Sequence, residues 1–399
     1  MDGLSKPETE RDVSTGTRTG EGIGRRIRAD ACRRAEVGYR VEVLITEGAS
    51  GGQSRAALAA VRALAIRGYR PVVTVSGNLS LAAASRFCTR TLRVPPADDT
   101  RYGARIQAEL DTGRYVTVFA TSDPALLALG LPVDRFVNKI DCLKVITAAG
   151  LAAPPSRTFA SRTELLAAAQ DLSFPAVVKP AIKTHLAILV HSPEALPSMV
   201  RVDGPVVVQP YLDHELRGVL GLVWRGELMA AVHLRYLRLW PLPCGTVAAA
   251  ESVEPDSALE ARLPDLFKGY DGLFHMDLAG PYVLDVNPRV HAALPLAVAA
   301  GANLVSMYCD LLRGRSIRSV RVRTGLFYRW IEGDVRSVVR SMREGRIGAR
   351  AALRALAPRH RAVHSYESLR DPAPTVARAR YLAGQLRMNS PMRPARSSG

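Results

Sequence analysis

The chain has 399 residues, of which 47% are hydrophobic, and carries a formal net charge of +17. This length predicts two to three domains. The charge alone would favour a nucleic-acid partner, but most of it comes from 20 arginines after residue 312, where only five acids occur. These arginines are spread through helical-looking sequence with few aromatics, which indicates a solvated face. Nucleic acid is therefore not an expected partner, and an anionic ligand for this region stays an alternative.

No segment of the sequence predicts a membrane location. A run of about 18 apolar residues is absent, and the polar N-terminal stretch lacks the apolar core of a secretory signal. The five cysteines are scattered without a CxxC pair, which indicates reduced thiols and neither a zinc site nor a disulfide framework. We expect a cytoplasmic protein without a membrane partner, and a homodimer is left open.

The first part of the chain predicts a disordered tail and then an α/β domain. Residues 1–38 are polar, charged and glycine-rich, and are expected to be disordered. Apolar strands and helices then alternate, which is typical of βαβ units and predicts a Rossmann-like domain with a parallel sheet over 39–135. Strands are expected near 40–46, 71–76, 91–94 and 115–121, with a helix over about 54–67. The glycine-rich turn before this helix lacks GxGxxG spacing, so it is a weak dinucleotide signal, although the helix start could face an anionic substrate.

A second domain is expected over 136–312. A helix over Lys139–Ala149 ends at Gly150, and the stretch AAPPS that follows marks a crossing between domains. The stretch LRGVLGLVWRGELMAAVHLRYL predicts a hairpin across its RG turn, and LPLAVAAGANLVSMYCDLL is expected to form one helix. A helical, basic region over 313–387 and a disordered tail over 388–399 complete the chain.

The stretch GLFHMDLAGPYVLDVNPRV predicts a second hairpin, with polar side chains on apolar strands. Asp285, Asn287 and Arg289 alternate, so all three are expected on one face, with Asp277 across the turn from them. Such groups are costly to bury without a ligand. Two carboxylates and an amide oxygen suit Mg²⁺, and the arginine suits a polyphosphate or a developing oxyanion. The alternative is a solvent-facing polar hairpin.

Lysine is rare in this sequence, which has six lysines against 48 arginines. A chain that prefers arginine so strongly is expected to keep lysine where a compact point charge is needed. Lys139 begins the helix before AAPPS, and Lys179 ends an apolar strand just before a proline. Both positions favour phosphate contacts, with an ordinary surface role as the alternative.

Four stretches of the second domain carry a family resemblance. In chain order they are NKIDCLKVITAAGLAAPPSRTF, FPAVVKPA, VVVQPYLDHE and FHMDLAGPYVLDVNPRVHAALPLAVAAGANL. Together they resemble the ATP-grasp superfamily, and the similarity runs from about residue 40 to residue 312. The chain looks most like carboxylate–amine ligase-like proteins related to the carbamoyl-phosphate synthase large subunit, and LRYLRLWPLPCGT and YESLRDPAPTV look like further segments of that group. The resemblance implies an ATP-grasp fold behind an N-terminal, Rossmann-like pre-ATP-grasp domain.

The resemblance also implies a Mg·ATP site. Lys139 and Lys179 fall on the two lysines that hold the ATP phosphates. Asp277 and Asp285 fall on the two Mg²⁺ carboxylates, and Asn287 falls on their shared third ligand. Two Mg²⁺ ions are expected, with Mn²⁺ as an alternative.

The remaining contacts implied by the resemblance concern the reacting group and the nucleoside. Arg289 falls on the catalytic arginine beside the reacting phosphoryl and acyl group. A hinge between two subdomains falls near 209–212, where adenine contacts are expected at Gln209, Tyr211 and Leu212. Glu215 falls on the ribose-binding acid.

The chain departs from the family pattern at several of these positions. Both metal carboxylates are usually glutamates in the family, and both are aspartates here, one methylene shorter. The stretch AIKTHLAILV has no glycine where the family often has a glycine-rich lid, which leaves Lys183 or backbone amides to contact the phosphates. Pro210 stands where glutamate is common, and Glu215 is about one residue nearer than usual.

The reaction implied by the resemblance has two steps. A substrate carboxylate takes the γ-phosphoryl group of ATP to form an acylphosphate, and an amine then attacks the acyl carbon. The expected partners are small-molecule carboxylates and amines, with amino acids or peptide-like compounds as the family expectation. Two alternatives stay open: a non-catalytic module that binds nucleotide or a polyanion, and a bicarbonate- or carbamoyl-type phosphorylating enzyme.

Three further residues are candidates for substrate binding. Arg235 and Arg238 lie on or near the strand that precedes the metal residues, and could bind a substrate carboxylate; the alternative is that both are exposed strand arginines. His291 follows Arg289 by two positions and is a candidate substrate contact, with packing or hydrogen bonding as the alternative.

Overall fold

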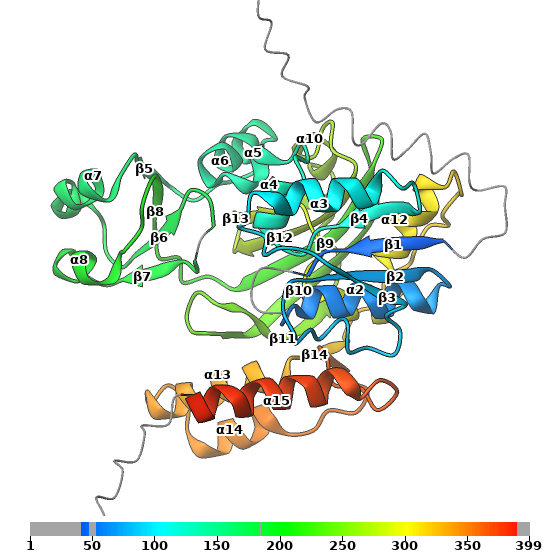
Figure 1. The fold of residues 1–399 in the computed structure, drawn as a ribbon. Helices are drawn as coiled ribbons and strands as arrows, with labels where there is room; N and C mark the ends of the chain where they lie inside the picture. The colour runs from blue at the N-terminus through cyan, green and yellow to red at the C-terminus, as the bar shows by residue number, and fades with distance from the viewer. Residues whose placement is uncertain (1–40, 48–52, 184, 389–399) are drawn as a thin grey trace, which may run out of the picture.

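The computed structural model describes residues 41–47, 53–183 and 185–388 (Figure 1). The two tails predicted to be disordered lie outside the described residues, apart from Met388, which ends the last helix. Three sheets organise the described part of the chain, and most helices pack on their faces.

A parallel four-stranded sheet, ordered β3-β2-β1-β4, lies in the N-terminal part. Its strands are β1 (Glu42–Ile45), β2 (Arg70–Val75), β3 (Arg90–Arg93) and β4 (Tyr115–Phe119), and its helices are α2 (Arg55–Ile66), α3 (Arg101–Leu110) and α4 (Asp123–Ala128). The predicted alternation and parallel sheet are confirmed. The strand order reverses between β1 and β4, so their carboxyl ends lie together where open α/β sheets usually bind ligands.

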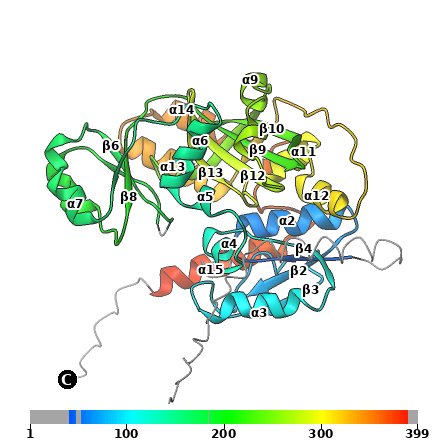
Figure 2. The same cartoon turned by 90° about the horizontal axis from the view of Figure 1, so that it is seen from above.

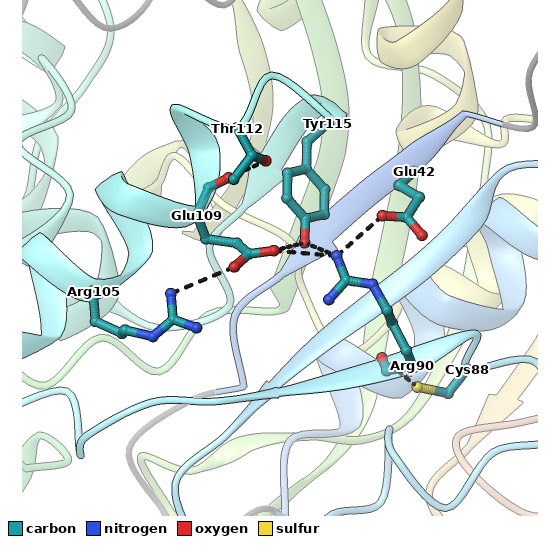
Figure 3. Close-up of polar contacts among 7 residues, drawn as sticks. All are labelled: Glu42, Cys88, Arg90, Arg105, Glu109, Thr112 and Tyr115. Carbon is teal, nitrogen blue, oxygen red and sulfur yellow. Dashed lines mark hydrogen bonds and ion pairs between the residues drawn. The ribbon is translucent and has the colours of Figure 1, made fainter.

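The opposite edge of this sheet, at the amino ends of the strands, is held by ion pairs (Figure 3). Arg90, at the start of β3, contacts Glu42 of β1 and Glu109 of α3, both at 3.1 Å. The Tyr115 hydroxyl donates a hydrogen bond to Glu109 at 2.7 Å, which together with Arg90 lowers the pKa of that carboxyl. The cluster ties α3 to the sheet and leaves the carboxyl edge as the candidate binding edge.

A smaller antiparallel sheet, ordered β5-β8-β6-β7, protrudes with its helices from the rest of the molecule (Figure 1). Helices α5 (Asp134–Val137) and α6 (Lys139–Ala148) lead into it. Its own elements are β5 (Arg157–Phe159), α7 (Arg162–Ala167), η1 (Ala169–Asp171), β6 (Ala176–Pro180), β7 (Ile188–Val190), η2 (Pro193–Ala195), α8 (Leu196–Met199) and β8 (Val206–Pro210). A separate apolar core stabilises this unit.

The largest sheet has seven strands, ordered β13-β12-β9-β10-β11-β14-β15. They are β9 (Leu216–Trp224), β10 (Glu227–Trp240), β11 (Thr246–Val253), β12 (Gly272–Ala279), β13 (Tyr282–Asn287), β14 (Phe327–Arg329) and β15 (Val363–His364). Short helices α9 (Ser257–Glu260) and α10 (Leu263–Leu266) precede β12. Both predicted hairpins are confirmed, with turns at Arg225–Gly226 and at Gly280–Pro281.

The stretch expected to form one long helix forms two, so that prediction is wrong. Helix α11 (Leu294–Ala300) ends at Gly301, whose φ of +107° stops the helix in the left-handed region. Helix α12 (Leu304–Leu312) then begins under the side-chain cap of Asn303, and the pair is bent by 80°. Within the described residues no single helix is long and apolar enough to cross a membrane, and only this bent pair passes by length and composition.

The C-terminal region, predicted to be helical and basic, contains three helices and also two short strands that were not predicted. Helices α13 (Ile331–Arg343), α14 (Ala349–Leu356) and α15 (Ala373–Met388) lie along one side of the molecule (Figure 1), while β14 and β15 extend the large sheet. Figure 2 shows α15 beside the N-terminal sheet, where Asp371 pairs with Arg62 of α2 at 2.8 Å. The region is therefore docked against both the large sheet and the N-terminal part.

Candidate functional site

A cavity of about 430 Å³ lies where the three sheets approach one another, a volume within the usual range for small-molecule sites. Ten of the thirteen residues predicted from the sequence line it: Lys139, Lys179, Gln209, Tyr211, Leu212, Asp277, Asp285, Asn287, Arg289 and His291. The other three, Glu215, Arg235 and Arg238, are not among its lining residues.

Asp277 and Asp285 stand directly opposite each other in the β12–β13 hairpin. The hydroxyl of Tyr236, on β10, donates a hydrogen bond to Asp277 at 2.8 Å and also contacts His275 Nε2 at 2.9 Å. Gly218 on β9 makes room for this tyrosine, since a Cβ there would lie 2.2 Å from the hydroxyl oxygen. Sequence reasoning missed Tyr236; the available signal was a glycine in the middle of the apolar strand β9.

Lys139 and Asp285 form a buried ion pair inside the cavity. The side chain of Asn138 caps α6 by accepting a hydrogen bond from the backbone of Ile140, which places Lys139 in the first turn. The lysine and aspartate side chains are 10% and 17% exposed. Burial opposes charging of either group, but their mutual attraction prevails, so the pKa of Lys139 is raised and that of Asp285 is lowered, with Lys183 and Lys179 contributing.

Lys179, the second rare lysine, lies at the end of β6 and donates a hydrogen bond to the backbone carbonyl of Leu284 at 3.2 Å. Burial lowers its pKa, an effect that the nearby Asp285 opposes. Lys139 and Lys179 therefore approach one carboxylate from two different elements, an α-helix and a small-sheet strand.

Arg289 lies just beyond β13, so the predicted run of three side chains on one strand ends at Asn287. It lines the same cavity nevertheless, and its Nη2 donates to the Asn287 side-chain oxygen at 3.0 Å. Its Nε donates to Asp123 Oδ1, so that Arg289 is held at 13% exposure between two fixed partners. Asp123 was missed; its sequence signal is the Ser-Asp-Pro helix start that directly follows β4.

The oxygen donors of Asp277, Asp285 and Asn287 fit a hard divalent cation. Among the described residues no group of three or more histidines, cysteines, aspartates or glutamates could hold a metal ion. The three residues offer two carboxylates and one amide oxygen. Such a set suits Mg²⁺, because that ion keeps few protein ligands and takes its other oxygens from water and phosphate. The Lys139 ammonium pairs with one oxygen of the Asp285 carboxylate, and the Asn287 amide nitrogen donates a hydrogen bond to the other at 3.1 Å.

Comparisons with known proteins agree with this architecture. No family model matches the sequence. The chain is 24% identical over 207 residues to the carbamoyl phosphate synthase large chain of Neisseria gonorrhoeae, a match that covers 47% of this chain and only 19% of that protein.

Several solved structures resemble this one. An L-amino acid ligase from Bacillus licheniformis matches with a TM-score of 0.51 and 17% identity, over 69% of this chain and 75% of that chain. An N5-carboxyaminoimidazole ribonucleotide synthetase in an ADP complex matches at 0.56 and 14%, over 77% and 85%. A carboxyaminoimidazole ribonucleotide synthase from Aspergillus clavatus complexed with ATP matches at 0.57 and 12%, over 72% and 81%.

The chain has the ATP-grasp fold. The resemblance seen in the sequence is thus borne out at the level of the fold. The chain passes from the small antiparallel sheet to the large sheet between β8 and β9, at the predicted hinge, and the division into two subdomains stays a prediction.

The segment predicted to be the hinge, residues 209–212, reaches the cavity, but part of it already forms hydrogen bonds within the protein. Gln209 is buried and donates from its side chain to Ser156 at 2.9 Å. The backbone N–H of Tyr211 donates to the carbonyl of Pro175 at 2.8 Å, so this N–H is not free for an adenine base. The exposed Glu215 does not line the cavity, and its predicted ribose contact stays a prediction.

The two strand arginines proposed for substrate binding have structural partners elsewhere. Arg235 pairs with Glu251 at 3.0 Å. Arg238 pairs with Asp334 of α13, a side chain with 0% exposure that also contacts Arg329 at 2.9 Å. Arg235 therefore ties β10 to β11 within the large sheet, Arg238 ties β10 to α13, and neither residue lines the cavity.

Further cations and imidazoles that line the cavity come from the glycine-free loop, from β12 and from the segment after β13. Lys183 and His185 line the cavity, so the loop after β6 reaches it without a glycine. The rings of His275 and His291 stack with centroids 3.6 Å apart. Burial is the main cause that lowers the pKa of both imidazoles, which keeps them neutral at pH 7.

Proposed function

We propose that this ATP-grasp chain catalyses ATP-dependent amide-bond formation between a small carboxylate and an amine, through an acylphosphate, with release of ADP and phosphate. The observation that carries the proposal is the convergence of two rare lysines, two aspartates, an asparagine and an arginine on one cavity. The similar solved structures include an L-amino acid ligase and complexes with ATP and ADP, which supports the same class of chemistry here.

In the first step the cavity residues position ATP and the acid. Lys139 and Lys179 are placed to hold the phosphates, and Lys139 can exchange its contact with Asp285 for a phosphate oxygen. Mg²⁺ bound at Asp277, Asp285 and Asn287 would supply positive charge beside the transferring phosphoryl group. The substrate carboxylate oxygen forms a bond to the γ-phosphorus while the bond from that phosphorus to ADP breaks.

In the second step the amine attacks the acyl carbon. The C–N bond forms, the C–O bond to the phosphate breaks, and inorganic phosphate leaves with the electron pair and accepts the proton that the nitrogen loses. Arg289 is fixed by Asp123 and Asn287, so it can stabilise the tetrahedral oxyanion without reorganisation. Cys244 also lines the cavity, but burial raises its pKa and keeps it a neutral thiol, which argues against a covalent route.

A screen of amino acids and small carboxylates, singly and in pairs, tests this function. Wild-type protein with Mg·ATP should release ADP and phosphate in equal amounts only with a productive pair, and mass spectrometry should find the condensed product. Asp285→Ala should abolish this release. Release with bicarbonate alone would support a carbamoyl-type enzyme instead.

Thermal unfolding tests the nucleotide part separately. Ligand at a hundredfold excess over its Kd stabilises the folded state by about 2.7 kcal/mol, so Mg·ATP should raise the melting temperature by several degrees. No shift at millimolar Mg·ATP would contradict nucleotide binding. A clear shift with no turnover of any pair would favour the non-catalytic alternative.

A further inference from the structure

Arg55 lines the same cavity but belongs to none of the phosphate, metal or hinge contacts described above. It is the first residue of α2, next to the N-cap Ser54, and both lie on the cavity wall together with Ala56. The positive end of the helix dipole therefore adds to the charge of the guanidinium. This side of the cavity comes from the N-terminal sheet, at the carboxyl end of β1.

The C-terminal region holds the Arg55 guanidinium in place. The guanidinium stacks 3.8 Å from the ring centre of Trp330, and its Nη1 donates to the Tyr328 hydroxyl at 3.3 Å and to the Ser365 hydroxyl at 3.5 Å. Trp330 is in turn packed against Gly333, where a Cβ would lie 2.2 Å from the indole ring. All the partners named here are uncharged, so they orient the cation without neutralising it.

The charge of Arg55 is not compensated in the way that two other fixed cations of the cavity are. Lys139 and Arg289 form ion pairs with Asp285 and Asp123. Lys179 also forms no ion pair among the described residues, but Asp285 acts on its charge and the ATP phosphates are its proposed ligand. No carboxylate among the described residues forms an ion pair with Arg55, and Glu367 acts on it only at longer range. Burial accordingly lowers its pKa. Arg55 is half-buried. A partly desolvated cation without a counter-ion is costly, and a bound anion would offset that cost.

His291 provides a second donor beside it. Nδ1 of this histidine accepts a hydrogen bond from the backbone of Ala293 at 3.2 Å, so the neutral ring carries its proton on Nε2. Arg55 is among the charges that act on the His291 imidazole, which puts the two within electrostatic range. The predicted substrate contact of His291 therefore has a donor and a neighbouring cation to support it.

We propose that Arg55 and His291 form an anion subsite that binds the unactivated carboxylate of an amino acid whose amine is the nucleophile. This rests on the proposed ligase function. One fixed guanidinium and one neutral imidazole match a single negative charge and the bidentate geometry of a carboxylate. A phosphate monoester carries close to two charges at neutral pH and matches this pair less well.

The test compares free amino acids with their α-amides as the amine component. Wild type, Arg55→Met, Arg55→Lys and Arg67→Met are assayed for ADP release with pairs of amino acids, and for binding of the same probes in the presence of Mg²⁺ and a non-hydrolysable ATP analogue. Arg67 lies at the end of the same helix with an exposed side chain, so Arg67→Met is the matched control. The melting temperature with and without Mg·ATP reports on folding and on the nucleotide site.

Arg55→Met should raise the KM for the free amino acid about 10- to 100-fold and leave the Mg·ATP stabilisation unchanged. Wild type should discriminate against the amide by a similar factor, and the variant should lose that discrimination. Arg55→Lys, which keeps the charge but not the fork, should recover part of the affinity, and it replaces Arg55→Met in the comparison if the latter does not fold. Arg67→Met should behave as wild type.

An unchanged KM in Arg55→Met, or equal use of acid and amide by wild type, would overturn the subsite. Tighter binding of phosphoethanolamine than of glycine would overturn the carboxylate assignment and indicate that the subsite binds a phosphate. If wild type turns over no pair, the ligase proposal fails, and the binding data decide the subsite on their own. Tighter binding of the acid than of the amide, abolished in Arg55→Met, would then support the subsite. The absence of this preference would refute the subsite.

Discussion

Replacing Asp285 with asparagine should lower the free energy of unfolding of the ligand-free protein by about 3–5 kcal/mol. The change keeps the shape of the side chain and removes its charge. Lys139, at 10% exposure, would then be left as a buried ammonium without its counter-ion, and Lys179 and Lys183 would lose the same carboxylate. The loss follows from stranding charges and not from a cavity, since the two side chains are nearly equal in volume.

Urea unfolding at pH 7, followed by circular dichroism, measures this loss. Asp141→Asn on α6, the helix of Lys139, is a matched control. The side chains of Asp141 and Lys144 are 47% and 72% exposed, so their ion pair should contribute less than about 1 kcal/mol. The double variant Asp285→Asn/Lys139→Met should be more stable than the sum of the single effects predicts, by about 1–3 kcal/mol. A loss in Asp285→Asn no larger than in Asp141→Asn would refute the reasoning, and additive single effects would refute the pairing.

Three further predictions concern stability away from that pair. Burial raises the pKa of Glu47 from its ordinary 4.5 to about 7, so the folded state binds more protons there than the unfolded state does. The free energy of unfolding should therefore fall by about 3 kcal/mol as the pH rises through this window. Urea titrations at pH 4.5 and pH 8 measure this fall, and Glu47→Gln should abolish it. Gly301 has a φ of +107°, so Gly301→Ala should lower the free energy of unfolding by about 1–3 kcal/mol. Gly384 lies in the open interior of α15, so Gly384→Ala should raise it by about 0.5–1 kcal/mol. Changes of the same sign in both variants would contradict the backbone argument. Arg238→Met should destabilise the protein by about 2–3 kcal/mol through the buried Asp334 without a selective change in KM, and a KM effect at unchanged stability would restore its substrate role.

Local patterns in the sequence are sufficient to predict the hairpin of β12 and β13. Alternating apolar residues and a glycine–proline turn determine its register, so the amino-acid order alone places Asp277 and Asp285 across the turn from each other. The rarity of lysine singles out Lys139 and Lys179 as candidates, because this arginine-rich chain has few lysines. The first signal needs only a few neighbouring residues, and the second needs only the composition of the chain.

The features that the sequence did not predict depend on long-range packing. Nothing local distinguishes Tyr236, whose position depends on Gly218 of a neighbouring strand. The helix start at Asp123 is visible locally, but its partner Arg289 lies 166 positions away. Arg238 looked like a substrate contact because its partner Asp334 belongs to a different region of the chain. The break at Gly301 was overlooked because the apolar pattern continues through it, although the cap residues were visible.

The contacts that orient Arg55 affect the order in which the parts of the cavity assemble during synthesis. The partners Tyr328 and Ser365 follow Arg55 by 273 and 310 positions, so the ribosome must synthesise most of the described chain before the wall around Arg55 can close. Contacts so distant in sequence form late in folding. The lysines and aspartates of the cavity can therefore come together before the wall around Arg55 does. The complete cavity exists only once the C-terminal region has docked.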